Sequence, residues 1–311
     1  MSVKVFIDGS SGTTGLRIAD RLAAWPEIEL LSISAEGRKD VHERAKVINS
    51  ADLAFLCLPD AASKEVMPLL RPDVKVLDTS TAFRTDPAWD YGFPELNGQK
   101  EKIQRSYRVA VPGCYASGFI SIARPLVELG LAPADSPFSC TGISGYSGGG
   151  KKMIAEYESP ARPAHSKLDA PKSYGLGLAH KHLPEMQKIS GLANPPAFVP
   201  VVCDYYSGMQ VLVPFQPVWG GAEKVAAGLA EYYRDAATIK VHALNEPLPE
   251  NGLYSNAMAG TDRMELYSTV NAAGDQMMLV SLFDNLGKGS SGAAVQCMNL
   301  MLGLPETQGL E

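Results

Sequence analysis

The sequence predicts an α/β protein built from two parts. Its 311 residues are enough for two domains of ordinary size. In the first third of the chain, short apolar strands alternate with helical segments, which is typical of βαβ units and a parallel, Rossmann-like sheet. After residue 114 the predicted strands become longer and more alternating, which indicates an α+β domain with a mixed sheet.

The first part is predicted to begin with a strand over Val3–Asp8, a glycine-rich turn and a helix over Leu16–Ala24. The apolar residues of this first helix recur at helical spacing, and a later helical stretch between strands is expected over Ala61–Leu70. The further strands of this part are expected at Glu29–Ser34, Leu53–Leu58, Val74–Leu77 and Tyr107–Val111.

The second part is predicted to open with a helix over Ser117–Leu129. A last helix over Ser291–Leu302 is apolar on one side. The strands between them are expected at Phe138–Ile143, Ala197–Asp204, Gln210–Phe215, Thr238–Ala243, Met264–Asn271 and Gln276–Phe283.

Composition narrows the class of protein. The net charge of −6 and the lack of a Lys/Arg block argue against a nucleic-acid partner or a membrane-surface patch. No apolar run is long enough to span a membrane, and no signal peptide is expected. Five widely spaced cysteines without a Cys-x-x-Cys pair argue against disulfides and structural zinc. We therefore expect a cytoplasmic protein with reduced thiols and no metal.

A nucleotide site is predicted at the first strand–helix turn. Gly9, Gly12 and Gly15 leave room for a phosphate to approach the amides at a helix N-terminus. The spacing differs from the G-x-G-x-x-G fingerprint, so a plain glycine-rich turn is the alternative. No acidic residue is clearly placed for a ribose after the second strand. Ser32, Ser34 and Arg38 favour NADP over NAD, although Arg38 could equally be a solvated charge.

Cys114 is the candidate nucleophile. It follows Pro112-Gly113 and opens a predicted helix, where the helix N-terminus favours the anionic thiolate. The alternative is an ordinary buried cysteine.

His180-Lys181-His182-Leu183-Pro184-Glu185 is the second candidate segment. The two histidines do not share a helix face, so they do not form a helical metal pair. Either could act as an acid/base group, or both could be ordinary polar residues. Arg84 follows a parallel strand, where an anion could bind, but it could also be an ordinary surface arginine. Gly145–Lys152 lacks the final Ser/Thr of a triphosphate loop and is interpreted as a mobile glycine loop near a site, with a plain surface loop as the alternative.

Taken together, these segments resemble the N-acetyl-gamma-glutamyl-phosphate reductases, in their shorter form, within the aspartate-semialdehyde dehydrogenase superfamily. The resemblance spans nearly the whole chain. Two positions depart from the family pattern, Val111 in place of the usual Asn and Lys181 in place of the usual Arg. The segments that carry it, in order, are Gly9–Gly15, Asp78–Arg84, Pro112–Ala116, His180–Glu185 and Asn285–Gly289.

The resemblance implies NADPH-dependent reduction of an acyl phosphate to a semialdehyde in arginine biosynthesis, through a thioester on Cys114. His180 or His182 would be the acid/base group, with a slight preference for His180. Residues implied to hold the cofactor are Gly9, Ser10, Ser11, Gly12, Thr13, Thr14, Gly15, Ser34, Arg38, Pro59, Asn285 and Gly289. Residues implied near the substrate or its phosphate are Arg84, Ser144 and Glu185.

The same resemblance implies an NADP-binding domain over 1–114 and 286–311. A catalytic and dimerisation domain would cover 115–285, in a homodimer or homotetramer. Three other hypotheses stay open: a reductase for another acyl phosphate such as aspartyl phosphate, a nucleotide-sensing module without turnover, and a dehydrogenase that forms no thioester.

Overall fold

The computed structural model describes residues 2–217 and 221–311, and the chain divides into two compact units. Unit 1 contains the chain up to Pro94, Gly98–Pro112 and Ser290–Leu310. Unit 2 contains Glu95–Asn97, Gly113–Gly289 and Glu311. The sequence-based scheme placed its boundaries after residues 114 and 285 and did not include the short segment 95–97. The functions assigned to the two domains stay predictions.

Unit 1 is a parallel six-stranded sheet in the order β2-β1-β3-β4-β6-β5. Its strands are β1 (Val3–Asp8), β2 (Ile28–Leu31), β3 (Leu53–Leu56), β4 (Lys75–Asp78), β5 (Asp90–Tyr91) and β6 (Arg108–Ala110). Its helices are α1 (Thr13–Leu22), α2 (Val41–Ser50), α3 (Asp60–Val66), α4 (Gln99–Arg105) and α9 (Gly292–Leu302).

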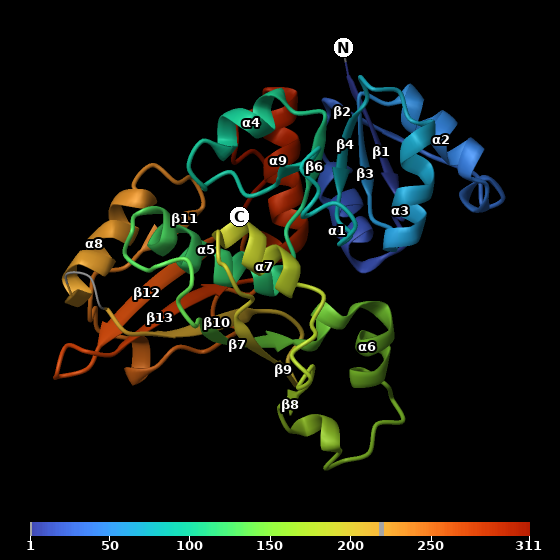
Figure 1. Cartoon of the computed structure of the whole chain (residues 1–311). Coiled ribbons are helices and arrows are strands. Elements are labelled where there is room, and N and C mark those ends of the chain that lie inside the picture. Colours follow the sequence, from blue (N-terminus) through green and yellow to red (C-terminus); the bar gives the residue numbers. More distant parts are fainter. Residues whose placement is uncertain (1, 218–220) are drawn as a thin grey trace. The chain divides into compact units, whose positions relative to one another are not determined.

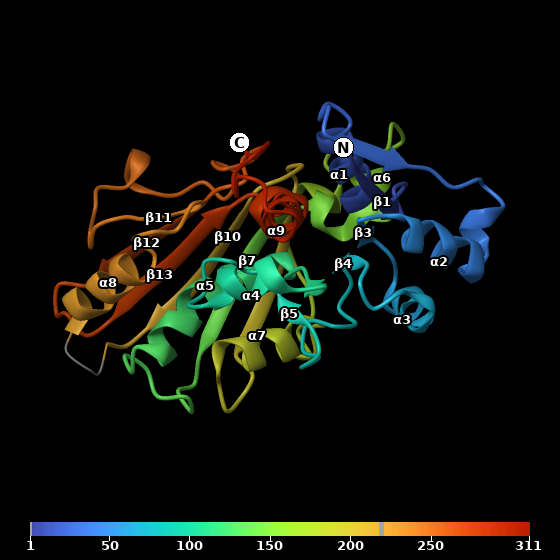
Figure 2. The same cartoon turned by 90° about the horizontal axis from the view of Figure 1, so that it is seen from above.

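Helices cover both faces of this sheet (Figures 1 and 2). Val5 and Ile7 point toward one face, where they join the buried residues of α1, α4 and α9. Phe6 points the other way, into a second cluster with Ile48 of α2 and Val66 of α3. Because successive side chains of a strand alternate between faces, a strand buried on both sides has a continuous apolar sequence.

Unit 2 is a mixed seven-stranded sheet in the order β11-β12-β13-β10-β7-β9-β8. The pairs β7·β9 and β11·β12 are parallel and the other pairs are antiparallel. The strands are β7 (Ser139–Gly145), β8 (Lys172–Ser173), β9 (Ala197–Cys203), β10 (Met209–Phe215), β11 (Ile239–Val241), β12 (Met264–Val270) and β13 (Met277–Phe283).

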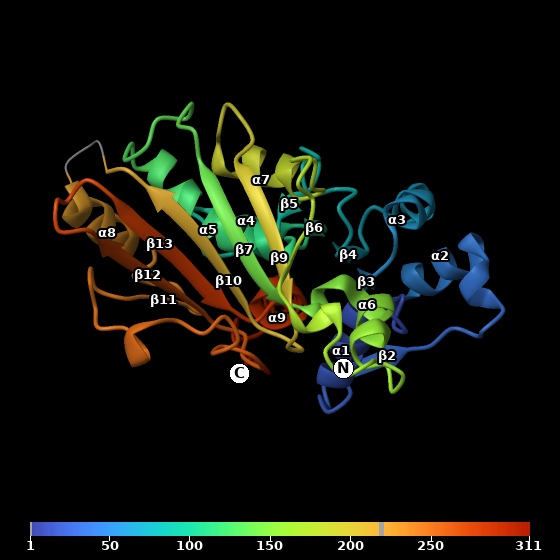
Figure 3. The same ribbon diagram turned by 90° about the horizontal axis from the view of Figure 1, so that it is seen from below.

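The helices of unit 2 are α5 (Cys114–Glu128), α6 (Gly150–Tyr157), α7 (Leu183–Ser190) and α8 (Gly221–Tyr232). Helix α5 packs on β10 and β13 and against both α7 and α8. These three helices lie on one face of the sheet, and Figure 3 looks onto the other face. In the described residues, no helix is long and apolar enough to cross a membrane.

The predicted fold class is confirmed. Two predicted helix starts were wrong: the helix expected from Leu16 begins at Thr13, and the helix expected from Ser117 begins at Cys114. Helices α2, α4, α6 and α8 were not placed by the sequence analysis. The second correction puts the candidate nucleophile inside the first turn of α5.

Helix α5 approaches its sheet closely through a glycine. A Cβ on Gly118 would lie 2.6 Å from Cγ2 of Val211 and 2.7 Å from Oγ of Ser281. The Ser281 hydroxyl also donates a hydrogen bond of 3.1 Å to the Gly118 carbonyl. Side chains at position 118 are therefore excluded by the packing that holds α5 on β10 and β13.

We predict that Gly118→Ala destabilises the fold by about 1–3 kcal/mol, since the strain of overpacking exceeds the gain in helix propensity. Urea denaturation would measure this as a lower midpoint. Gly177→Ala is the matched control, because a Cβ there meets no atom within 4 Å. An unchanged midpoint in Gly118→Ala would contradict the close approach of α5 to its sheet.

Candidate active site

Cys114 is the first residue of α5, and Gly113 is its N-cap in an extended conformation. The Gly113 amide donates to Oε2 of Glu185 at 3.2 Å, and both groups are buried. Ser117 adds a hydrogen bond from its amide to the Gly113 carbonyl. The start of α5 is thus fixed from two sides, and the half-buried thiol lies where the helix N-terminus favours a thiolate.

The surroundings of three other cysteines favour the neutral thiol, and the fourth is buried in a helix. Burial raises the pKa of Cys57 to about 12, and it also raises the pKa of Cys140 and Cys203. Cys297 is fully buried in α9 and its Sγ contacts the Gly92 carbonyl at 3.4 Å. Among the residues that the structure describes, Cys114 is the one cysteine in the first turn of a helix.

Both candidate histidines lie in an aromatic cluster beside Cys114. The His180 ring packs edge-on against Tyr115 and Phe198, with ring centroids 5.9 and 5.1 Å apart. The His182 ring lies 4.7 Å from that of His180. Tyr174 donates to the Tyr115 hydroxyl at 3.4 Å, and burial raises the pKa of Tyr174 to about 12. The structure thus brings the cysteine and histidine segments together in unit 2.

His180 is held as a neutral imidazole. Burial, helped by the charge of Lys181, lowers the pKa of His180 from 6.5 to about 4. Its Nδ1 accepts a hydrogen bond of 3.1 Å from the His182 amide. The proton of the neutral ring therefore lies on Nε2, which leaves His180 as a hydrogen-bond donor at neutral pH.

Two residues predicted near the substrate form hydrogen bonds with main-chain groups of unit 2. Glu185 is 1 % exposed and accepts from the Gly113 amide, so its carboxylate anchors the start of α5. Ser144 on β7 is also buried, and its hydroxyl donates to the Gly145 carbonyl at 3.0 Å. Any contact of either residue with the substrate stays a prediction.

Asn285 fastens the turn that follows β7. Its Nδ2 donates to Oγ of Ser147 at 3.0 Å, and its Oδ1 accepts from the Gly208 amide at 2.9 Å. Both ends of the amide side chain are thus used within unit 2. Gly289 lies beside Cys114, because a Cβ there would be 3.0 Å from Cβ of Cys114. The cofactor-binding roles of Asn285 and Gly289 stay predictions.

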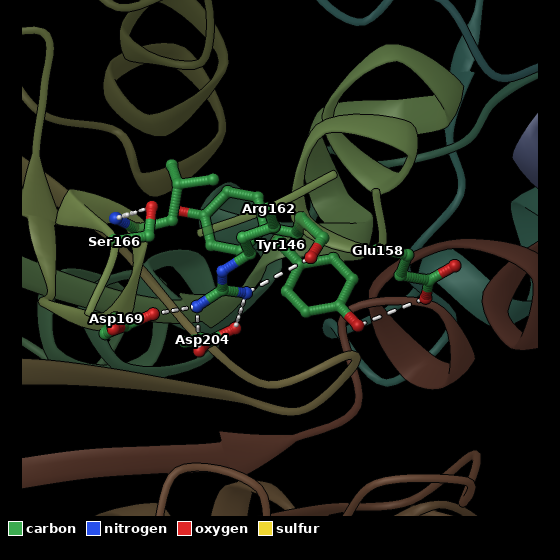
Figure 4. Close-up of polar contacts among 8 residues, drawn as sticks. Tyr146, Glu158, Arg162, Ser166, Asp169 and Asp204 are labelled. Carbon is green, nitrogen blue, oxygen red and sulfur yellow. Dashed lines mark hydrogen bonds and ion pairs between the residues drawn. The ribbon is translucent and has the colours of Figure 1, made fainter. Parts of the chain in front are cut away.

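The same turn is supported from outside by a charged cluster that sequence reasoning missed (Figure 4). Arg162 donates to both carboxylate oxygens of Asp204 and also pairs with Asp169. Its guanidinium lies over the Tyr157 ring, which stacks on Tyr146 at 4.7 Å. Tyr146 in turn donates to Glu158 at 3.1 Å. These contacts fix the segment 146–162, which the sequence analysis interpreted in part as a glycine loop.

Arg84 belongs to unit 1 and is only 8 % exposed. Its Nε donates to the Val111 carbonyl and one terminal nitrogen donates to the Thr79 carbonyl, both at 2.9 Å. Arg84 therefore braces the chain between β6 and Pro112. The prediction that it faces a phosphate stays a prediction.

The predicted nucleotide site in unit 1 contains a cavity of about 410 Å³. Asp8 at the end of β1 also lines it, which the sequence analysis did not single out, and Ser34 caps Gly37 beside it with a 3.0 Å hydrogen bond. Pro59 is the N-cap of α3. The predicted residues that line the cavity are Gly9, Ser10, Ser11, Ser32 and Arg38.

The glycines of the turn allow its backbone to pack closely against neighbouring backbone. Gly9 has a positive φ of +88°, and a Cβ there would lie 2.3 Å from the Cys57 carbonyl oxygen. A Cβ on Gly15 would lie 2.5 Å from the Gly9 carbonyl oxygen. Oγ1 of Thr13, the first residue of α1, is buried and has no hydrogen-bond partner among the described residues. An unsatisfied hydroxyl at a helix N-terminus fits a dinucleotide phosphate.

Comparison with known proteins covers nearly the whole chain. Residues 4–105 match the family model described as semialdehyde dehydrogenase, NAD binding domain, and 114–285 match the semialdehyde dehydrogenase dimerisation domain. A protein of Trichormus variabilis named N-acetyl-gamma-glutamyl-phosphate reductase is 46% identical over 99% of both chains. Proteins of Burkholderia lata and Pseudomonas putida with that name, the latter numbered 2, are 45% and 43% identical over 96% and 98% of both chains.

Solved structures share the fold at low sequence identity. An aspartate semialdehyde dehydrogenase from Francisella tularensis superposes with a TM-score of 0.72 and 15% identity, covering 96% of this chain and 100% of that one. The enzyme of the same name from Candida albicans, solved with NADP, gives a TM-score of 0.68 and 15% identity, covering 97% and 99%. These likenesses support the fold.

The lowered pKa of His180 predicts a pH dependence of stability. Between pH 4 and 6.5 the unfolded chain binds more protons at this position than the folded protein, so the free energy of unfolding falls as pH is lowered through that window. Urea midpoints should therefore drop more in the wild type than in His180→Asn on moving from about pH 7 to about pH 5. The exposed His42→Asn is the control and should follow the wild type. Equal slopes in His180→Asn and the wild type would refute the neutral His180.

Proposed function

The chain belongs to the N-acetyl-gamma-glutamyl-phosphate reductase family of the semialdehyde dehydrogenases, and on that basis we propose that it works through a thioester on Cys114. It is an oxidoreductase that converts N-acetyl-L-glutamyl 5-phosphate to the 5-semialdehyde with release of phosphate, in arginine biosynthesis. The observation that supports the proposed mechanism is the place of Cys114 in the first turn of α5.

In the proposed first step, Sγ of Cys114 forms a bond to the acyl carbon and the bond from that carbon to the phosphate oxygen breaks. Phosphate leaves with the electron pair of that bond, and a thioester remains on the protein. A thiolate suits both halves of the reaction, because it is a strong nucleophile toward acyl carbon and a good leaving group from the reduced intermediate. When bound, a nicotinamide cofactor would supply the hydride to the thioester carbon. The bond from that carbon to Sγ then breaks, which releases the semialdehyde and returns the electron pair to Cys114.

We assign His180 the role of hydrogen-bond donor to the acyl oxygen. Its Nδ1 is occupied by the His182 amide, so Nε2–H is the available group. A neutral imidazole donor can stabilise developing negative charge on an oxygen without carrying a charge of its own. His182, which is 5 % exposed, then supports His180 and does not need to contact the substrate.

The matched family domain is described as an NAD binding domain, so the cofactor is a nicotinamide dinucleotide. We propose that it is NADP. The turn Gly9–Gly15 would hold the pyrophosphate at the N-terminus of α1. Ser32 and Arg38, which line the cavity beyond β2, would hold the ribose 2′-phosphate. Of the remaining predicted residues, Arg84 and Ser144 are proposed near the substrate and Asn285 and Gly289 near the cofactor.

We further propose that the chain acts as a homodimer or homotetramer in the cytoplasm. The region 114–285 matches a dimerisation domain, which supports an assembly. The second face of the unit 2 sheet is covered in part by the chain itself, because Leu248, Leu253 and Met258 pack on the cluster that contains Val280 and Leu282. Over β7 and β9 the same face carries the half-buried Ile143 and Val201, and we propose that this part meets a partner subunit (Figure 3).

The reaction can be tested in reverse. NADP⁺ reduction with N-acetylglutamate semialdehyde should require inorganic phosphate, because phosphate must attack the thioester for the enzyme to turn over. Cys114→Ser should lower kcat by about 10³-fold or more, as removal of a nucleophile does in other covalent enzymes.

Cys203→Ser is the matched control and should retain wild-type activity, since burial raises the pKa of Cys203 and the residue lies at the end of β9. Phosphate-independent reduction, or turnover that survives in Cys114→Ser, would refute the thioester. Activity with aspartate semialdehyde and none with the acetylated substrate would reassign the substrate.

Cofactor choice gives a separate prediction. Arg38→Ala should raise KM for NADPH by about 10- to 100-fold and leave KM for NADH nearly unchanged, because only NADPH carries the phosphate that the guanidinium would bind. Lys39→Ala removes a neighbouring exposed charge that does not line the cavity and should change neither value. Equal changes in both cofactors would argue against the proposed 2′-phosphate site.

A further inference from the structure

A fully buried ion pair lies one residue from the glycine that contacts Cys114. Nζ of Lys288 is 2.6 Å from Oε1 of Glu95, and the two side chains are 2 % and 1 % exposed. Oγ1 of Thr238 donates to the same carboxylate oxygen at 2.5 Å. Lysine and glutamate are rarely buried to this degree, so the pair needs a reason.

Lys288 belongs to a π-helical turn, Gly287–Ser291, in which the Gly289 amide donates to the Asp284 carbonyl at 2.9 Å. The glycines on either side of Lys288 are both tightly packed. A Cβ on Gly287 would lie 1.9 Å from the Thr261 carbonyl oxygen, and one on Gly289 would lie 3.0 Å from Cβ of Cys114. The backbone of this turn thus fills the space between Thr261 and the nucleophile, and the Lys288 side chain is its anchor. π-turns of this kind occur frequently at functional sites.

Stability alone does not account for the ion pair. Burial of two charges costs solvation free energy that their attraction often does not recover, and apolar or neutral replacements of similar volume can be as stable. What the pair does supply is a fixed distance between segment 95–97 and the turn 287–291. Segment 95–97 is itself tied to unit 2, because the Asn97 amide donates to the Tyr232 hydroxyl at 3.1 Å.

We propose that Glu95 and Lys288 are positioning residues that hold the Gly289 backbone against Cys114 and thereby fix the orientation of the thiol. This inference rests on the proposed role of Cys114 as nucleophile. It assigns the pair a function in the reaction, although neither charged group needs to touch the substrate.

The test compares Lys288→Met with the double variant Glu95→Gln/Lys288→Met. The single variant leaves a buried carboxylate without its ammonium and should lose thermal stability. The double variant removes both charges with little change in volume or local net charge, and it keeps an acceptor for Thr238. Its Tm should return close to the wild-type value. The exposed pair Glu223→Gln/Lys224→Met on α8 is the matched control.

Three quantities are measured on each folded variant: kcat and KM in the phosphate-dependent assay, Tm, and the rate of Cys114 alkylation by iodoacetamide, followed by mass spectrometry. In the double variant we expect kcat to fall about 10- to 100-fold with little change in KM, as a misplaced reacting group produces. The alkylation rate of Cys114 should change in parallel, although Tm is restored.

A double variant with wild-type kcat and a wild-type alkylation rate would overturn the proposal, because the pair would then have no effect on the thiol. Thr238→Val, which removes one hydrogen bond to Glu95, should shift kcat and alkylation in the same direction by a smaller factor. It provides the same test if the double variant does not fold. If alkylation of Cys114 leaves wild-type turnover intact, the nucleophile assignment fails, and that outcome is separate from failure of the positioning pair.

Discussion

The hydrogen bond from the Gly113 amide to the Glu185 carboxylate is the constraint on which the candidate active site depends. It joins the start of α5 to the first turn of α7 in the interior of unit 2, where an unpaired amide would be costly. Cys114 follows Gly113 directly, and His182 is the N-cap of α7. One buried carboxylate therefore sets the relative positions of the nucleophile and the histidine segment, although Glu185 itself is turned toward the backbone.

The surroundings of His180 suggest separate roles for the cysteine segment and the histidine segment in the proposed mechanism. Tyr115, Tyr174 and Phe198 pack around the half-buried ring, and burial lowers the pKa of His180 to about 4. A neutral histidine cannot stabilise a thiolate as a partner charge, as it does in cysteine–histidine ion pairs. In the proposed mechanism the N-terminus of α5 would stabilise the thiolate, and the Nε2–H group of His180 would donate a hydrogen bond to a substrate oxygen. The two roles do not compete for one proton.

The sequence predicted most of what local pattern controls. The sequence analysis predicted the fold class, the apolar strands of unit 1 and the glycine-rich turn. A strand buried on both faces is recognised by its continuous apolar residues, and a position with positive φ is recognised by its glycine. Helix α6 was missed, since a run of glycines precedes it and Gly150 begins it. Helix α2 was also missed, although Asp40 could have indicated its start, because the Asp40 side chain accepts hydrogen bonds from the amides of His42 and Glu43. The contacts of Glu185 with Gly113 and of Asn285 with Ser147 join residues far apart in the chain, and no local pattern indicates such partners.

The places where the chain passes between its two units explain why the least predictable contacts gather around Cys114. Glu95, Gly113 and Gly289 are three of the five positions at which the chain enters or leaves unit 2. Within unit 2 these three points are linked, because Lys288 pairs with Glu95 and Gly289 packs against Cys114. The nucleophile thus lies at a junction of segments that are remote in sequence, and its surroundings are set by packing between them. Such a junction is rigid only if each segment is anchored, and a buried ion pair with one preferred geometry is well suited to anchor a turn whose glycines offer no side chains.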